Sequence, residues 1–316
     1  MQTTQSINTS IVRSTVIALG LLSTLLPVSQ TAYAQGDLGG DFVAPAVFQA
    51  AGPTAASIQS TVDAFRAALG SVNNGNNPGP LLSGRREINW DGVPNLSAAP
   101  NAFPADFFNV NSPRGVLFST PGSGFQVSAS PGIAPVEFGN IDPSYPGTFG
   151  VFSAPRLFTA LGSNVVDVNF FVPGSTTSAL SRGFGAVFTD VDLANATSIS
   201  LFDATNTSLG TFFAQPLAGS ETLSFIGVAF AMPAVSRVRI VSGTAALGGG
   251  VLDGPVDLAV LDDLVFGEPV GPGAVPEPAT LLLVAAGAAG FGLITRRRPS
   301  ARRGRDGRLS SPLSGA

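Results

Sequence analysis

The sequence predicts a mainly β protein: an antiparallel, jelly-roll-like β-sandwich with a short N-terminal amphipathic helix and a single C-terminal transmembrane helix. Hydrophobic residues make up 44% of the 316 residues, and 38 glycines and 25 prolines accompany them. A chain this apolar is not intrinsically disordered. Beyond residue 80, short alternating runs are separated by turn-forming residues at intervals of roughly 8–12 residues, which is typical of sandwiches.

One soluble helix is expected, over residues 54–69. Thr54 or Ser57 can cap its start, and Gly70 stands where a C-terminal cap belongs. The segment 73–80, rich in Asn, Gly and Pro, predicts a linker. The apolar positions of the helix repeat at helical spacing and form one face: Ile58, Val62, Phe65 and Leu69.

The strands are expected in the body of the chain, and the run 165–172 shows the pattern best. Val166, Val168 and Phe170 alternate with the polar Asp167 and Asn169. The order of such runs over residues 160–267 resembles galactose-binding-like jelly rolls. The last run, with its hydrophobic-Asp-Asp-hydrophobic sequence, is similar to the closing strand of MAM-type adhesion modules. This resemblance implies a sandwich with a calcium ion in a loop.

Missing residue types restrict the chemistry. The chain has no Cys and no His, and all 16 basic residues are Arg. Disulfides, thiol nucleophiles, Cys or His metal ligands, Ser-His-Asp triads and Schiff-base lysines are therefore excluded. We expect that the protein is not an enzyme. A hydrolase that uses a pair of carboxylates on glycans remains the alternative, although no local motif marks such a pair.

Charge is distributed unevenly along the chain. Between residues 35 and 275, eight arginines stand against eighteen acidic residues, a net charge of −10. An acidic body of this kind argues against nucleic acid as a partner, because nucleic-acid binding needs a basic surface. It is compatible with cation binding.

The N-terminus has the features of a secretory signal peptide, residues 1–34. Arg13 precedes an apolar run over 15–28, which Pro27 ends before it could span a bilayer. Ala32 and Ala34 form a small-x-small cleavage site, so we expect signal peptidase to cut after Ala34.

The C-terminal region combines three features in order. An uncharged apolar run over 279–295 is just long enough for a transmembrane helix. Basic residues follow the run at once, and the positive-inside rule keeps them in the cytoplasm. The basic cluster is Arg296, Arg297 and Arg298, and the extended element before the run is Val275, Pro276, Glu277 and Pro278.

Together these three features resemble the PEP-CTERM sorting signal. The resemblance implies a Gram-negative envelope protein whose body lies on the periplasmic side of the inner membrane. It further implies cleavage near the motif by an exosortase, and release to the cell surface or extracellular matrix. Proteins of this type accompany exopolysaccharide and biofilm-matrix loci. The basic tail over 299–316 departs from the family, whose members usually stop soon after the arginines.

Two pairs of aspartates are candidate metal ligands. Asp262 and Asp263 are adjacent in a strand, so one of them joins an apolar row unless a bulge turns it out. A buried carboxylate needs an Arg, backbone N–H groups or a metal as its partner. Asp190 and Asp192 are two residues apart and would share a face. Oxygen ligands without His or Cys favour Ca²⁺. The alternative is a surface pair together with an aspartate bonded to backbone in a turn.

Trp90 and Asp91 are a candidate ligand contact. An aromatic face beside a carboxylate is one way to hold a sugar ring. The alternative is that Trp90, the only Trp, plugs the core under a loop. Arg85 and Arg86 precede this pair, and we expect them to form a solvated basic spot.

These observations predict an exported protein of the cell envelope or extracellular matrix, with a body that binds or organises exopolysaccharide. A glycan hydrolase and a purely structural matrix protein without a specific ligand are the alternatives. The expected organisation is a signal peptide (1–34), an N-terminal segment (35–80), a β-sandwich body (81–267), a linker (268–275), the sorting signal (276–298) and a disordered basic tail (299–316).

Overall fold

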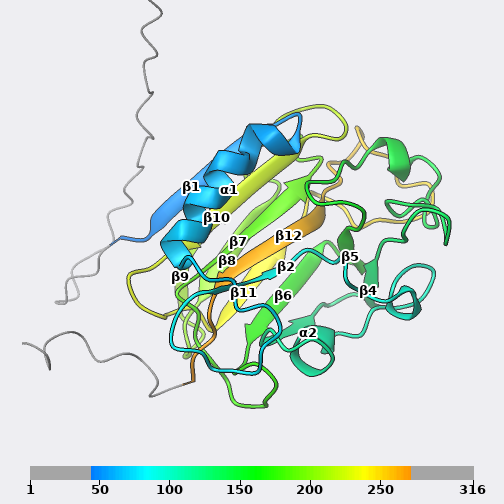
Figure 1. The fold of residues 1–316 in the computed structure, drawn as a ribbon. Coiled ribbons are helices and arrows are strands. Elements are labelled where there is room, and N and C mark those ends of the chain that lie inside the picture. The colour runs from blue at the N-terminus through cyan, green and yellow to red at the C-terminus, as the bar shows by residue number, and fades with distance from the viewer. Residues whose placement is uncertain (1–43, 272–316) are drawn as a thin grey trace, which may run out of the picture. The chain divides into compact units, whose positions relative to one another are not determined.

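The computed structural model describes residues 44–271, which form two antiparallel β-sheets with few helices (Figure 1). The predicted mainly β fold class is thereby confirmed. Within residues 44–271, no helix combines the length and apolar character that crossing a membrane requires. The predicted signal peptide, the apolar helix over 279–295 and the basic tail lie outside the described residues.

The larger sheet has seven strands in the order β1-β10-β7-β12-β5-β4, and β2 also pairs with β12. In its three central strands, β10, β7 and β12, every residue is buried. Strands buried on both faces require a cover on the outer side. The strands are β1 (Ala46–Gly52), β2 (Arg85–Ile88), β4 (Gly124–Val127), β5 (Phe158–Leu161), β7 (Gly183–Thr189), β10 (Leu223–Ala229) and β12 (Val260–Gly267).

Helix α1 (Ala55–Leu69) provides that cover (Figure 1). The predicted helical face is the buried one, and Phe65 packs against two glycines that are directly paired across β7 and β10, Gly185 and Gly227. A Cβ atom on either glycine would come within 2.6 or 2.7 Å of the Phe65 ring. These two positions therefore require glycine because the helix approaches the sheet so closely.

The smaller sheet has five strands in the order β3-β6-β11-β8-β9. Its strands show the alternation that the sequence predicts: in β6, Val166 and Val168 face the core, while Asp167 lies on the outer face beside Arg237 and Arg239, each 2.8 Å away. The strands are β3 (Val116–Ser119), β6 (Val165–Phe170), β8 (Ser198–Phe202), β9 (Ser208–Phe213) and β11 (Arg237–Val241).

Phenylalanine and valine make up most of the core between the two sheets, to which β3, β5, β6, β7, β8, β11 and β12 all contribute side chains. A smaller apolar cluster around Tyr145 and Phe149 lies beneath the loops beside β5 and β12. The remaining helical turns are short: α2 (Phe107–Val110) and the 3₁₀ turns η1 (Asn95–Ser97) and η2 (Tyr145–Gly147).

The N-terminal segment is part of the same sheet structure. Sequence analysis expected strands only beyond residue 80, but β1 pairs along its full length with β10. Arg86 is 0% exposed and forms two bonds of 2.7 and 2.8 Å with the carboxylate of Glu268. That carboxylate also accepts hydrogen bonds from Asn74 and the Leu81 backbone. Arg86 is therefore an internal clamp and not a solvated basic spot.

Candidate metal centre

Asp190 begins the loop that follows β7. Its φ of 66° is left-handed, a conformation that Asp tolerates better than most residues, and its backbone N–H donates to the Thr222 carbonyl at 2.9 Å. Asp192 follows in the same loop. The two aspartates therefore lie beyond the end of a strand, and not on one strand face as the sequence predicted, yet their carboxylates do approach each other.

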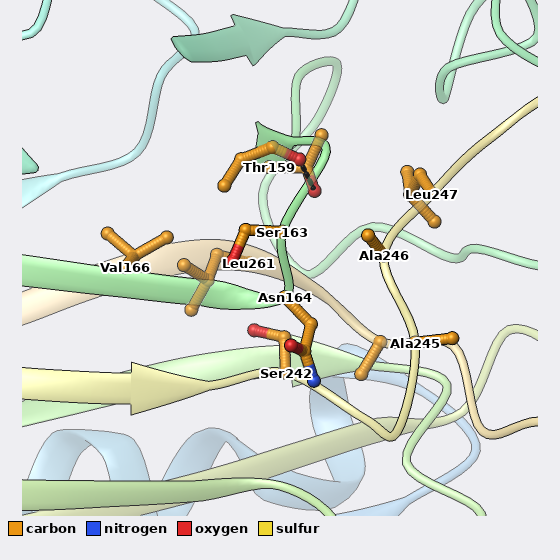
Figure 2. A pocket seen from close by; sticks show the side chains of 11 residues that line it. Thr159, Ser163, Asn164, Val166, Ser242, Ala245, Ala246, Leu247 and Leu261 are labelled. Carbon is orange, nitrogen blue, oxygen red and sulfur yellow. Dashed lines mark hydrogen bonds between the residues drawn. The ribbon is translucent and has the colours of Figure 1, made fainter. Parts of the chain in front are cut away.

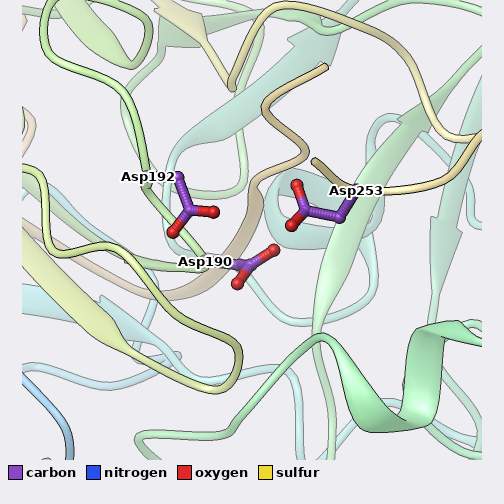
Figure 3. Close-up of side chains that lie close together, drawn as sticks. All are labelled: Asp190, Asp192 and Asp253. Carbon is purple, nitrogen blue, oxygen red and sulfur yellow. The ribbon is translucent and has the colours of Figure 1, made fainter. Parts of the chain in front are cut away.

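A third aspartate, Asp253, joins them from the loop between β11 and β12. One carboxylate oxygen each from Asp190, Asp192 and Asp253 lies within 4.8 Å of the other two. The three carboxylates point toward one another (Figure 3). Asp253 was not predicted, because a lone aspartate in a Gly-rich loop, 61 residues after Asp192, has no periodic pattern to place it.

Asp190 is the most unusual group of this cluster. The residue is 0% exposed, and within residues 44–271 neither of its carboxylate oxygens accepts a hydrogen bond. Burial, followed by the charges of Asp253, Asp192 and Asp257, raises the pKa of Asp190 to about 8. A buried carboxylate without donors is costly unless a cation joins it.

The other members of the cluster are held in place by backbone groups. Asp192 accepts the Gly219 N–H at 2.9 Å, and Asp253 accepts the Leu258 N–H at 3.3 Å. Both are only half-buried, so the cluster opens toward solvent on their side. Asp257 accepts the Asp192 N–H at 3.0 Å with one oxygen, and its other oxygen has no partner among the described residues. The three carboxylates of the cluster, with no nitrogen or sulfur ligand among them, suit a hard cation such as Ca²⁺.

Asp262 and Asp263 lie elsewhere and have protein partners. The register of β12 against β7 shifts between Leu261 and Leu264, so the pair sits at a β-bulge. Both carboxylates then reach one residue: the Ser153 hydroxyl lies 2.6 Å from Asp263 and 3.1 Å from Asp262. The Phe152 N–H donates to Asp262 at 2.5 Å.

Arg66 of helix α1 completes this pair, with its guanidinium 3.6 Å from the Asp263 carboxylate. Burial and the neighbouring Asp263 carboxylate raise the pKa of Asp262 well above its usual range, and burial also raises that of Asp263. This pair therefore has two of the partners that a buried carboxylate needs: backbone N–H groups, reached at the bulge, and the arginine Arg66. The oxygens of this pair interact with protein groups, so the pair is not part of the metal cluster.

Trp90 lies in the core, as the alternative interpretation had it. The side chain is 1% exposed, its ring stacks parallel on Phe158 at 4.1 Å between centroids, and its Nε1–H donates to the Asp262 carbonyl at 2.5 Å. Asp91 accepts the Arg156 N–H at 3.2 Å, and burial raises its pKa to about 6. Neither ring face of Trp90 is available to a sugar.

Two hollows in the body differ greatly in size. The pocket lined by Thr159, Asn164 and Ser242 (Figure 2) has a volume of about 10 Å³, room for one water and not for a sugar. A groove beside α2 has a volume of about 400 Å³, which is within the range of small-molecule sites.

Comparison with known families identifies the C-terminal region. Residues 274–298 match the family model of the PEP-CTERM protein-sorting motif. This chain carries a PEP-CTERM protein-sorting motif. It is exported, its C-terminus is membrane-associated, and it is sorted by an exosortase. No curated protein and no solved structure matches the chain. The resemblance of the body to jelly-roll and MAM-type modules is thus not confirmed.

Proposed function

We propose that the body of this PEP-CTERM protein is a calcium-binding matrix module that binds and organises acidic exopolysaccharide without catalysing a reaction. One observation carries the proposal: the fully buried Asp190 carboxylate has no donor among residues 44–271 and faces two further aspartates. A divalent cation would supply the positive partner that the Asp190 carboxylate does not have among the described residues.

The geometry supports a shared ion. Ca²⁺ takes six to eight oxygen ligands, and the aspartates provide only part of such a set. Because Asp192 and Asp253 are half-buried, the remaining positions face solvent. Water, or a carboxylate or hydroxyl of an acidic polysaccharide, would fill them. An ion bound by both molecules would link protein to matrix. We expect an affinity of about 10⁻⁴–10⁻³ M, as in extracellular calcium modules.

Binding is favoured over the glycosidase alternative. A glycosidase needs two carboxyl groups facing a substrate across a cleft, roughly 5–9.5 Å apart. Asp262 and Asp263 are buried under Ser153, and Asp190 is fully buried. Neither group can meet a glycosidic bond without opening the fold.

The proposal includes the export route. Signal peptidase would cut after Ala34, and the arginines after residue 295 would hold the C-terminus at the cytoplasmic side of a Gram-negative inner membrane. The body would then lie in the periplasm until an exosortase, acting near Val275–Pro278, releases it to the cell surface or matrix.

Thermal unfolding of the full chain in detergent tests the calcium site. A cation that binds only the folded state raises the melting temperature by mass action. We expect Ca²⁺ at several millimolar to raise it by a few degrees relative to chelator. Asp190→Asn should abolish the shift, whereas Asp106→Asn, at an exposed aspartate, should keep it. A wild-type protein that ignores Ca²⁺ would overturn the proposal.

Co-sedimentation tests the polysaccharide. A polyuronate should retain the wild-type protein more strongly in Ca²⁺ than in chelator, and a neutral glucan should not retain it. Equal retention by both polymers, or none by either, would leave a structural matrix protein as the better description.

A further inference from the structure

The groove beside α2 has room for a sugar ring. It has a volume of about 400 Å³ and lies between the loop after β2 and the segment that contains α2. Phe107 and Phe108 line it on one side, and Asn89, Asn111 and Arg114 bring polar groups to it. It combines an apolar wall with convergent polar groups, as small-molecule sites do.

Arg114 is positioned by its own neighbours. Its Nε donates to the Glu87 carbonyl at 2.8 Å, Nη1 contacts the Ser112 hydroxyl, and the guanidinium carbon lies 5.1 Å from the centre of the Phe108 ring. These contacts fix the plane of the guanidinium and leave Nη2 without a hydrogen-bond partner within residues 44–271. The side chain is therefore oriented before any ligand arrives.

No carboxylate neutralises Arg114 in the part of the chain that the structure describes. Five arginines there form salt bridges (Arg66, Arg85, Arg86, Arg237 and Arg239). Arg114 forms none, although sixteen acidic residues and only eight arginines lie between residues 44 and 271. Burial and the charge of Arg86 lower the pKa of the Arg114 guanidinium, as expected where a nearby anion is lacking.

The groove lining carries no acidic residue at all. Its two exposed amides, Asn89 and Asn111, make no side-chain hydrogen bond with the described residues. An arginine prefers a planar oxyanion such as a carboxylate, and amides suit the hydroxyls of a sugar. The apolar wall that Phe107 and Phe108 contribute suits the apolar face of its ring.

We propose that this groove binds a uronate residue, a sugar ring that bears a carboxylate, with Arg114 pairing with the carboxylate. The inference rests on the proposed binding of acidic exopolysaccharide and adds the site and the sugar class. It does not use the metal cluster, so binding in the groove is independent of Ca²⁺.

Calorimetry on the full chain in detergent, with chelator present, tests this site. The probes are a uronate trisaccharide and its carboxyl-reduced neutral counterpart. We expect the uronate to bind at least tenfold more tightly than the neutral sugar. Arg114→Gln should weaken uronate binding at least tenfold. The matched control is Arg239→Gln, which removes the same charge from the outer face of the smaller sheet and should bind like the wild type.

Asn111→Ala provides a second variant, because this exposed side chain holds no part of the fold; we expect it to weaken uronate binding severalfold. The groove proposal is overturned by equal affinity for the two sugars, by an Arg114→Gln variant that binds like Arg239→Gln, by no binding, or by equal binding of an acidic peptide. If the calcium shift persists while uronate binding fails, only the groove is wrong. If uronate binds while the calcium shift is absent, only the metal centre is wrong.

Discussion

Asp190 and Asp262 are both 0% exposed; Asp190 directly follows β7, and Asp262 lies in the neighbouring strand β12. They differ in the hydrogen bonds that their carboxylates accept. Asp262 accepts hydrogen bonds from Phe152 and Ser153, and burial together with the neighbouring Asp263 carboxylate raises its pKa. Asp190 accepts none from the described residues. A buried carboxylate that accepts hydrogen bonds from the protein is part of the structure. A buried carboxylate that accepts none can still bind a ligand. Four changes test this comparison.

The largest expected effect is the loss of Asp262. Asp262→Ala removes the acceptor of the Phe152 and Ser153 N–H groups and leaves these part-buried donors without that partner. We expect the free energy of unfolding to fall by about 3 kcal/mol or more. Urea denaturation measures it, and Ca²⁺ should not restore it. The exposed control Asp106→Ala should stay within about 0.5 kcal/mol of wild type. A loss under about 1 kcal/mol would contradict the structural role.

The next effect has the opposite sign. Asp190→Asn removes a buried charge that lacks donors, so in chelator at pH 8 the variant should be about 1–3 kcal/mol more stable than wild type. Urea denaturation in chelator measures the difference, with Asp106→Asn as control. A variant less stable than wild type would show that an unnoticed partner already satisfies this carboxylate.

The pH dependence separates the two groups further. The pKa of Asp190 is raised to about 8, so between about pH 4 and pH 8 the folded state binds a proton that the unfolded state has lost. Without Ca²⁺, stability must therefore fall as the pH rises through this window. Asp91, Asp262 and Asp263, whose pKa values are also raised, contribute the same sign and remain in Asp190→Asn.

Urea denaturation in chelator at pH 5 and pH 8 measures this contribution as the difference between the two proteins. The fall in stability from pH 5 to pH 8 should be smaller in Asp190→Asn than in wild type. Identical pH profiles would mean that Asp190 keeps an ordinary pKa.

The smallest effect concerns Asp257, which borders the metal cluster through its hydrogen bond with the Asp192 backbone. One carboxylate oxygen of Asp257 accepts the Asp192 N–H, so only its other oxygen could bind Ca²⁺. We expect Asp257→Asn to weaken Ca²⁺ binding less than Asp253→Asn does, as measured by calorimetry. If Asp257→Asn weakened Ca²⁺ binding more than Asp253→Asn did, the ion would lie closer to Asp257 than to Asp253.

Local patterns in the sequence predicted those parts of the fold that neighbours in sequence determine. The face of α1 and the alternation of β6 follow directly from residue spacing. Strand β1 was not expected, because its small apolar residues alternate weakly at the sheet edge. Arg86 was misjudged because its partner, Glu268, lies 182 residues away. No local pattern records such a pairing.

The site was predictable in the same partial way. Asp190 and Asp192 stood out because they are close in sequence, although the left-handed turn at Asp190, and not a strand face, brings their carboxylates together. Asp253 and the groove at Arg114 depend on loops that meet only in the folded chain. Unsatisfied hydrogen-bonding capacity distinguishes one buried aspartate from another, and that property exists only in three dimensions.

The backbone pairing of Val270, three residues after the end of β12, bears on the processing of the chain. Val270 is joined to Leu180 by two backbone hydrogen bonds of 2.8 and 3.0 Å, and the matched sorting motif begins at residue 274. Four residues of chain can extend over at most about 14 Å. An exosortase that cuts near the motif, as we propose, would have to accept a folded domain within a few residues of the bond it cleaves. Cutting near the motif would release a protein with hardly any trailing peptide.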